Sequence, residues 1–175
     1  MIKDGRMTIN KLTHPLVGNE AEIFERLLSD KGAIKVDYLS LGISCFSLFS
    51  FDYSNCNGVA LLNQRHGALS HFDLICGDPD KYLRGMIDDF IQMSGNEGIA
   101  AVLVGGDKDH FTINKNILRQ YRIPVIGFFL DGYDDKDMLI IEGEEGKGEK
   151  GIVVVPEQRL VVMCSEIHGY QRLTP

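Results

Sequence analysis

Apolar residues occur in short runs through most of the chain and in a four-residue repeat in a few segments. The runs are rich in β-branched, aromatic and leucine residues and are separated by Gly, Asn and Asp, which is typical of strands joined by turns. They predict strands over residues 36–43, 45–51, 58–62, 68–75, 99–104, 124–130, 138–141, 152–155 and 160–164. Segment 142–151, with its many Gly, Glu and Lys residues, suits a solvated loop.

Three segments repeat apolar residues at helical spacing. In the clearest of them, 81–93, Tyr82, Met86 and Phe90 recur every four residues, and Asp78-Pro79 precedes them as a helix start. Helices are also predicted over 21–29 and 114–121. The order of a helix, several strands, a helix, a strand, a helix and several strands predicts a mixed α/β fold in which helices pack on sheets.

With 175 residues, of which 44% are hydrophobic, the chain has the length of one globular domain with a sizeable core. We expect a single domain over 1–175, with an N-terminal extension at 1–18 and a core at about 19–165. No stretch approaches the roughly 20 apolar residues of a membrane span. The start of the chain lacks the apolar core of a signal peptide. These features predict a cytoplasmic protein without membrane insertion, with a secreted effector that has no cleavable signal as the alternative.

The formal net charge is -7, and no basic stripe offsets it, so we expect no nucleic-acid partner. The four cysteines, Cys45, Cys56, Cys76 and Cys164, form no CxxC pair and have no metal-ligand spacing. They are expected to be free thiols, three of them with packing roles only. No metal and no organic cofactor are expected.

One cysteine and one histidine stand out because of their neighbours. Cys45 ends the phrase LGISC, and His71 ends the phrase GALSH. Strand ends and tight glycine turns can hold a nucleophile and its base rigidly near solvent. The sequence therefore predicts Cys45 as nucleophile and His71 as base, with Gly42 and Ser44 as support where a backbone N–H stabilises an oxyanion. Asp73 shares a strand face with His71 and is a candidate orienting carboxylate.

These phrases resemble those of the chemoreceptor glutamine deamidase family (CheD) and, more distantly, of toxin deamidases such as the cytotoxic necrotizing factors. In that family a Gly-x-(Gly)-Ser-Cys phrase carries the nucleophile, and a Gly-(Ala/Gly)-x-(Ala/Ser)-His phrase carries the base. The family's later phrases, a strand ending in Gly-Gly, an Asn-Ile step and Ile-Pro-Val, have counterparts at 102–106, 116–117 and 123–125. The resemblance covers about 36–162 and implies mixed β-sheets packed as a sandwich with flanking helices.

Two positions depart from the family pattern. The family places a Thr six residues before the nucleophile, where its hydroxyl orients the histidine, and Leu39 stands there in this chain. Ser40, one residue later, is the candidate third member, although a shift of one residue turns a strand side chain to the other face. Chemotaxis members also carry a basic phrase where this chain reads DDKD at 134–137, which implies a protein substrate other than a chemoreceptor.

The residues and the resemblance together predict a protein-glutamine deamidase. Cys45 attacks the carboxamide carbon as a thiolate, and His71 takes the thiol proton and then gives it to the leaving ammonia. The expected partner is a protein with a reactive glutamine, either chemoreceptor-like or another regulatory protein. Two alternatives stay open: a related Cys–His hydrolase acting on another amide or an ester, and a family member whose site has decayed into a binding or regulatory module.

Overall fold

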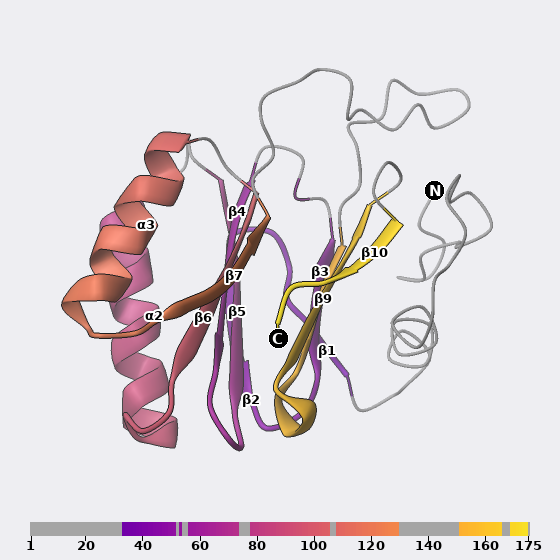
Figure 1. Cartoon of the computed structure of the whole chain (residues 1–175), viewed down its shortest axis with the longest axis horizontal. Helices are drawn as coiled ribbons and strands as arrows, with labels where there is room; N and C mark the ends of the chain where they lie inside the picture. Colours follow the sequence, from indigo (N-terminus) through magenta and orange to yellow (C-terminus); the bar gives the residue numbers. More distant parts are fainter. Residues whose placement is uncertain are drawn as a thin grey trace.

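The computed structural model describes residues 33–51, 53, 56–73, 78–105, 108–129, 151–165 and 169–174. In this part of the chain, two mixed five-stranded sheets face each other, and two α-helices cover the outer face of one sheet (Figure 1). The predicted class, α/β with mixed sheets packed together and flanking helices, is thereby confirmed. None of the described helices is long and apolar enough to cross a membrane.

The first sheet carries the helices and has the strand order β2-β5-β4-β6-β7. Its strands are β2 (Ser40–Ser44), β5 (Gly67–Asp73), β4 (Cys56–Leu62), β6 (Ala100–Gly105) and β7 (Val125–Phe129). Neighbouring strands are antiparallel except for β6 and β7, which are parallel. Every residue of β4 and of β6 is buried, because these central strands are covered on both faces.

The second sheet has the strand order β1-β3-β8-β9-β10. Its strands are β1 (Ile34–Lys35), β3 (Leu48–Phe51), β8 (Gly151–Val155), β9 (Leu160–Ser165) and β10 (Gly169–Arg172), with the 3-10 turn η3 (Pro156–Gln158) between β8 and β9. Only the β1–β3 pair is parallel. The core between the sheets contains Val36, Leu48, Tyr53, Cys56, Ala60, Leu62, Leu69, Val102, Val104, Ile152, Val154, Val161 and Met163.

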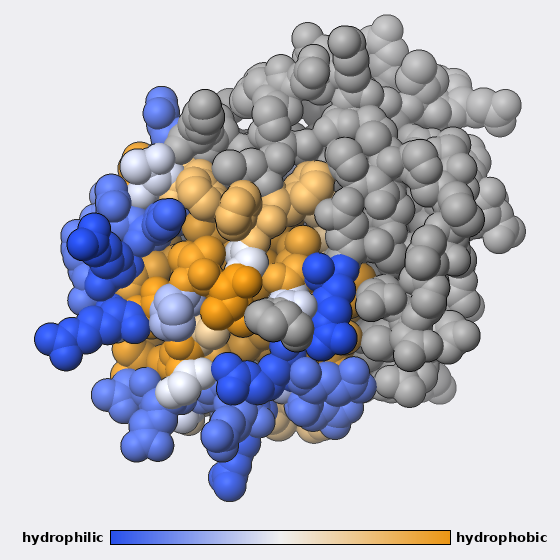
Figure 2. Space-filling model, in the orientation of Figure 1, coloured by the Kyte–Doolittle hydropathy of each residue, from blue (hydrophilic) through white to orange (hydrophobic). Residues whose placement is uncertain are grey.

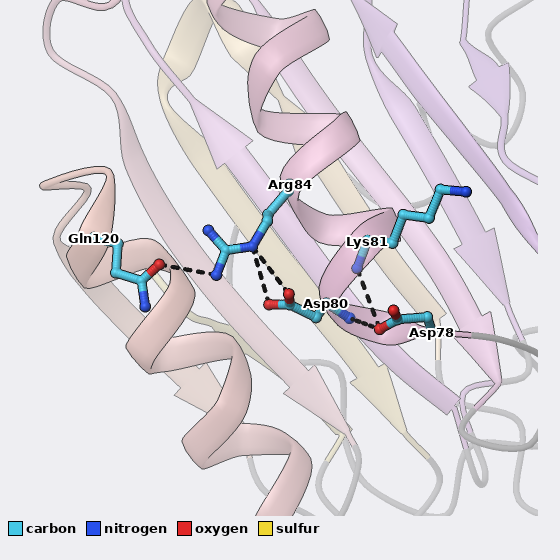
Figure 3. A network of polar contacts seen from close by, with 5 residues as sticks. All are labelled: Asp78, Asp80, Lys81, Arg84 and Gln120. Carbon is cyan, nitrogen blue, oxygen red and sulfur yellow. Dashed lines mark hydrogen bonds and ion pairs between the residues drawn. The ribbon is translucent and has the colours of Figure 1, made fainter.

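Helix α2 (Pro79–Ser94) begins as its sequence predicts. The Asp78 side chain caps it by accepting hydrogen bonds from the backbone N–H groups of Asp80 at 3.1 Å and Lys81 at 3.4 Å. Arg84, one turn later, forms an ion pair with Asp80 at 3.0 Å and donates to Gln120 Oε1 at 2.8 Å on helix α3 (Lys108–Gln120) (Figure 3). These polar contacts join the solvent-facing sides of the two helices.

The inner sides of the helices pack on the first sheet. Leu83, Met86, Ile87 and Phe90 of α2 are at most 1% exposed and lie in one apolar cluster with residues of β4, β5, β6 and α3. Figure 2 shows hydrophilic side chains over the helices and apolar ones gathered beside them, over the part of the molecule where β7 lies. Phe128 on β7 is 57% exposed, which fits the place of this strand at the edge of the sheet.

Several boundaries differ from the prediction. A turn splits the predicted strand 36–43: Ser40 N donates to Asp37 O at 3.1 Å, and Leu39 has a φ of 56°. Leucine is not a typical turn residue, so the apolar pattern hides this turn. Helix α3 begins at Lys108 rather than at 114, and β10 was not predicted because it lacks an apolar run. The predicted helix 21–29 and strand 138–141 lie outside the described residues.

Candidate active site

His71 lies near the end of β5 and is only 2% exposed. It shares a strand face with Leu69, so its ring points into the core between the sheets. Its Nδ1 atom is 2.9 Å from Oγ of Ser50 on β3, and that hydroxyl donates its proton to the carbonyl of Val36 at 2.5 Å. Because a hydroxyl has one proton, Ser50 accepts from Nδ1–H. His71 is therefore the Nδ1–H tautomer, with the lone pair on Nε2 where a general base needs it.

Two tyrosine rings contact the imidazole of His71. The Tyr53 ring is stacked on it, with centroids 4.1 Å apart and planes 17° apart, and the Tyr38 ring meets it edge-on at 5.6 Å and 88°. Tyr53 is completely buried and donates its phenol proton to the carbonyl of Ser70 at 2.8 Å. Burial raises the pKa of Tyr53 far above its ordinary value, so the phenol stays neutral.

The pairing of β4 with β5 is interrupted beside His71, at Gly58 and Val59. The Ser70 hydroxyl fills the interruption, since it accepts from Val59 N at 3.0 Å and donates to Val59 O at 3.3 Å. A Cβ atom on Gly58 would lie 2.6 Å from Cε1 of Tyr53. The missing side chain of Gly58 therefore makes room for the ring that stacks on the imidazole.

The structure does not bring Cys45 next to His71. In the antiparallel pairing of β2 with β5, Ser40 lies opposite His71 and Ser44 lies opposite Gly67. Cys45 follows Ser44 in an exposed bend outside the strand. It lies five residues beyond the partner of His71, or roughly 16 Å along the strand at about 3.3 Å per residue. The Cys45 thiol thus follows one end of β2, whereas His71 on β5 lies beside the other end, because β2 and β5 run in opposite directions.

The other predicted residues of the β2 phrase have identifiable structural roles. Ser44 Oγ accepts from Phe46 N at 2.8 Å and so stabilises the bend after β2. A Cβ atom on Gly42 would lie 2.7 Å from a methyl group of Val36, so this glycine serves close packing between the sheets. The oxyanion support predicted for Gly42 and Ser44 beside Cys45 stays a prediction.

Ser40 lies directly opposite His71, close to the predicted position of the third member. Its hydroxyl makes a long hydrogen bond of 3.5 Å to the carbonyl of Tyr38. The hydroxyl bonded to Nδ1 is that of Ser50, so the orienting role predicted for Ser40 falls to Ser50 in this structure. The side chain of Asp73, the other candidate for that role, lies outside the described part.

Cys56 lies much closer to the imidazole than Cys45 does. It is the first residue of β4, is 6% exposed and belongs to the core between the sheets. It pairs with Asp73, two residues beyond His71, so Cys56 and His71 are diagonal neighbours on one face with Cβ atoms roughly 7 Å apart. Tyr53 is their common neighbour, because its ring stacks on His71 and Cys56 contributes to its raised pKa. Cys45 and Cys56 are both free thiols, as predicted.

Ser50, Tyr53 and Cys56 were not predicted as residues of the site. One signal could have found two of them: Ser50 stands six residues before Cys56, the spacing that the resemblance assigns to the orienting hydroxyl and the nucleophile. The glycine turn beside Cys45 directed the prediction to the other end of β2. Nothing in the sequence marks Tyr53 as the ring that stacks on His71.

Gly105, at the end of β6, completes the surroundings of Cys56. It has a φ of 70°, and a Cβ atom there would lie 2.4 Å from the carbonyl oxygen of Cys56. The glycine therefore allows the backbone of β6 to approach the start of β4. Gly106, the other glycine of the pair, lies outside the described residues.

Within the described residues, no group of three or more His, Cys, Asp or Glu side chains is arranged to hold a metal ion. The structure places a serine hydroxyl and two phenol rings against the imidazole, with Cys56 at a diagonal position on the neighbouring strand. Such a set can perform thiol nucleophilic chemistry with a histidine base. No family model and no curated protein sequence matches this chain.

Proposed function

We propose that this chain is a cysteine hydrolase that deamidates glutamine side chains of a protein, with Cys56 as nucleophile, His71 as base and Ser50 as the residue that orients the imidazole. The observation that supports the proposal is the Ser50–His71 hydrogen bond, which puts the proton on Nδ1 and makes Nε2 the basic nitrogen of His71. The spacing of Ser50 and Cys56 supports a fold and a site like those of the glutamine deamidases.

The reaction begins with transfer of the Cys56 thiol proton to Nε2 of His71. The thiolate attacks the carboxamide carbon, and the resulting tetrahedral intermediate breaks its C–N bond when the imidazolium protonates the nitrogen. Ammonia leaves, and a thioester remains on Cys56. Water then gives a proton to His71 and attacks the thioester, which releases glutamate and returns the proton to the thiol. Throughout, the Ser50 bond keeps the proton on Nδ1 and the ring in one orientation.

The burial of the two reacting groups suits this chemistry. Cys56 and His71 are 6% and 2% exposed, so the thiolate–imidazolium pair forms away from bulk water, where attraction between opposite charges is stronger. Tyr53 stacks on the imidazole as a neutral ring and contributes no competing negative charge. The product carries a new carboxylate in place of an amide, which changes the charge of the partner protein.

Four variants test the proposal: Cys56→Ser, His71→Ala, Ser50→Ala and, as the matched control, Cys45→Ser. The assay is ammonia release and the mass change of a panel of glutamine-containing proteins, chemoreceptor domains included. We expect Cys45→Ser to keep the activity, and Cys56→Ser and His71→Ala to lose it. Loss in Cys45→Ser with activity in Cys56→Ser would restore Cys45 as the nucleophile and refute this assignment.

The second candidate is a binding or regulatory module that has lost the reaction. The observation in its favour is that both Cys56 and His71 are buried and that two aromatic rings lie against His71. A hydrolase acting on esters or small amides is the third. Turnover of small acyl substrates that depends on Cys56 identifies the third candidate. Absence of every Cys56-dependent turnover, together with a bound partner, identifies the second.

The proposed partner is a cytoplasmic regulatory protein with an accessible glutamine. The acidic phrase at 134–137, which bears on the choice between a chemoreceptor and another target, lies outside the described residues. Exchange of this phrase for a basic one, followed by the same assay on chemoreceptor domains, measures its effect on substrate choice.

A further inference from the structure

The groups proposed to react lie beneath the surface, and one half-exposed side chain lies against His71. Of the two rings on the imidazole of His71, that of Tyr53 is fully buried, whereas Tyr38 is 51% exposed. Tyr38 therefore spans the distance from solvent to the buried His71. A substrate side chain that approaches past Tyr38 has to displace its ring from the imidazole.

The turn that carries Tyr38 is exposed and contains a strained residue, Leu39. It runs from Asp37 to Ser40 and is closed by one backbone hydrogen bond of 3.1 Å between these residues. Leu39, at its centre, has a φ of 56°, a left-handed conformation that is unfavourable for a leucine. Leu39 is 44% exposed, and the ion pair of Lys35 with Asp37 at the start of the turn is exposed as well. A strained turn with little buried surface is the kind of segment that opens locally.

We propose that the turn Asp37–Ser40 is a gate over the site, and that Tyr38 decides which amides reach it. In the closed turn, the Tyr38 ring lies against His71; in the open turn, the carboxamide of a substrate takes its place. Because the reacting groups are buried, the gate favours a longer side chain, glutamine over asparagine. This inference rests on the proposed function, since it takes Cys56 and His71 as the reacting groups.

The test measures access to Cys56 by a small probe, independently of turnover. The full chain reacts with iodoacetamide, and mass spectrometry follows the alkylation of each cysteine over time. We expect Tyr38→Ala to raise the alkylation rate of Cys56 about ten-fold. Leu39→Asn relieves the left-handed strain and stabilises the closed turn, so we expect a rate about five-fold lower. Exposed Cys45 serves as the internal reference, with one rate in all variants.

Tyr82→Ala is the matched control, because Tyr82 is a 49% exposed tyrosine on α2 that contacts Phe72 and not the site. Equal Cys56 rates in wild type, Tyr38→Ala and Tyr82→Ala would overturn the gate. A faster rate in both variants would also overturn it, since it would indicate general loosening. The His71→Ala variant separates the two proposals: if Tyr38→Ala raises the alkylation rate of Cys56 while His71→Ala leaves that rate unchanged, the gate stands and the catalytic pair fails.

Discussion

Replacement of Ser50 by alanine tests the central contact of the site. The Ser50 hydroxyl, on β3, joins three parts of the fold because it donates to the carbonyl of Val36 and accepts from Nδ1–H of His71. Ser50 is 1% exposed, so water has little access to compensate for its loss. Ser50→Ala therefore removes the hydrogen-bond partner of two buried groups at once.

The expected cost follows from these two bonds. A typical buried hydrogen bond contributes about 1 kcal/mol, and a buried group that loses its partner costs about 1–3 kcal/mol. We expect Ser50→Ala to lower the free energy of unfolding by about 2–3 kcal/mol. For a domain of this size, that corresponds to a melting temperature lower by about 5–10 °C. Ser50→Thr keeps the hydroxyl, and is expected to keep most of the stability despite the added methyl group.

A purely structural role of Ser50 would change stability alone, so the assay needs a second readout. Nitrogen-15 chemical shifts of His71 report which ring nitrogen carries the proton. We expect mainly the Nδ1–H form in the wild type and in Ser50→Thr, and a mixture of both tautomers in Ser50→Ala. The rate of Cys56-dependent amide hydrolysis is expected to fall in proportion to the lost Nδ1–H form.

Two results would refute this reasoning. A change in the free energy of unfolding below about 0.5 kcal/mol would mean that the two buried bonds contribute little. A Ser50→Ala variant that keeps mainly the Nδ1–H tautomer would mean that another contact sets the proton on Nδ1. In the second case Ser50 would be a packing residue, and the proposed catalytic set would lose its third member.

Three further predictions concern the space beside Tyr53, the pH dependence of stability and the core beneath α2. Gly58→Ala brings a Cβ atom within 2.6 Å of Tyr53 and is expected to cost about 1–3 kcal/mol of stability in denaturant unfolding. Gly85→Ala, in open space on α2, is expected to stabilise by about 0.5–1 kcal/mol, and similar effects of both variants would contradict the steric argument. Burial raises the pKa of Tyr53, so above about pH 10 the unfolded chain loses this proton first, and stability falls with rising pH by up to about 1.4 kcal/mol per pH unit. Tyr53→Phe is expected to reduce this slope in unfolding measured across that range, and equal slopes in both proteins would count against it. Phe90→Ala is expected to cost about 3–5 kcal/mol, and Arg84→Ala, in an exposed ion pair, much less. Thermal melting that ranks the two variants in the opposite order would contradict the assignment of the core.

The sequence predicts the regular elements well where the apolar pattern reflects burial alone, as in a fully buried strand or an amphipathic helix. The apolar run at 99–104 is a buried central strand, and the repeat of Tyr82, Met86 and Phe90 lies on helix α2. The turn at Asp37–Ser40 escapes prediction because a leucine occupies its left-handed position. Local patterns carry no information on the strand register that decides which residue faces His71.

The candidate site illustrates the same limit. The phrase GALSH points to a histidine whose Nδ1 atom bonds to Ser50 in the structure, while its role as a base stays a prediction. The choice between Cys45 and Cys56 depends instead on which end of β2 meets which end of β5. The contact of Ser50 with His71 joins two different sheets, and only the packed structure brings them together.

The proposed reacting groups and the residue that orients them all come from one continuous stretch of chain, from Ser50 on β3 through β4 to His71 on β5. Contacts within such a short stretch close small loops, so this part of the fold can form before the distant pairing of β3 with β8. From outside this stretch, the Val36 carbonyl accepts the Ser50 proton and the Tyr38 ring meets the imidazole of His71, so substitutions near these two residues reach the site directly.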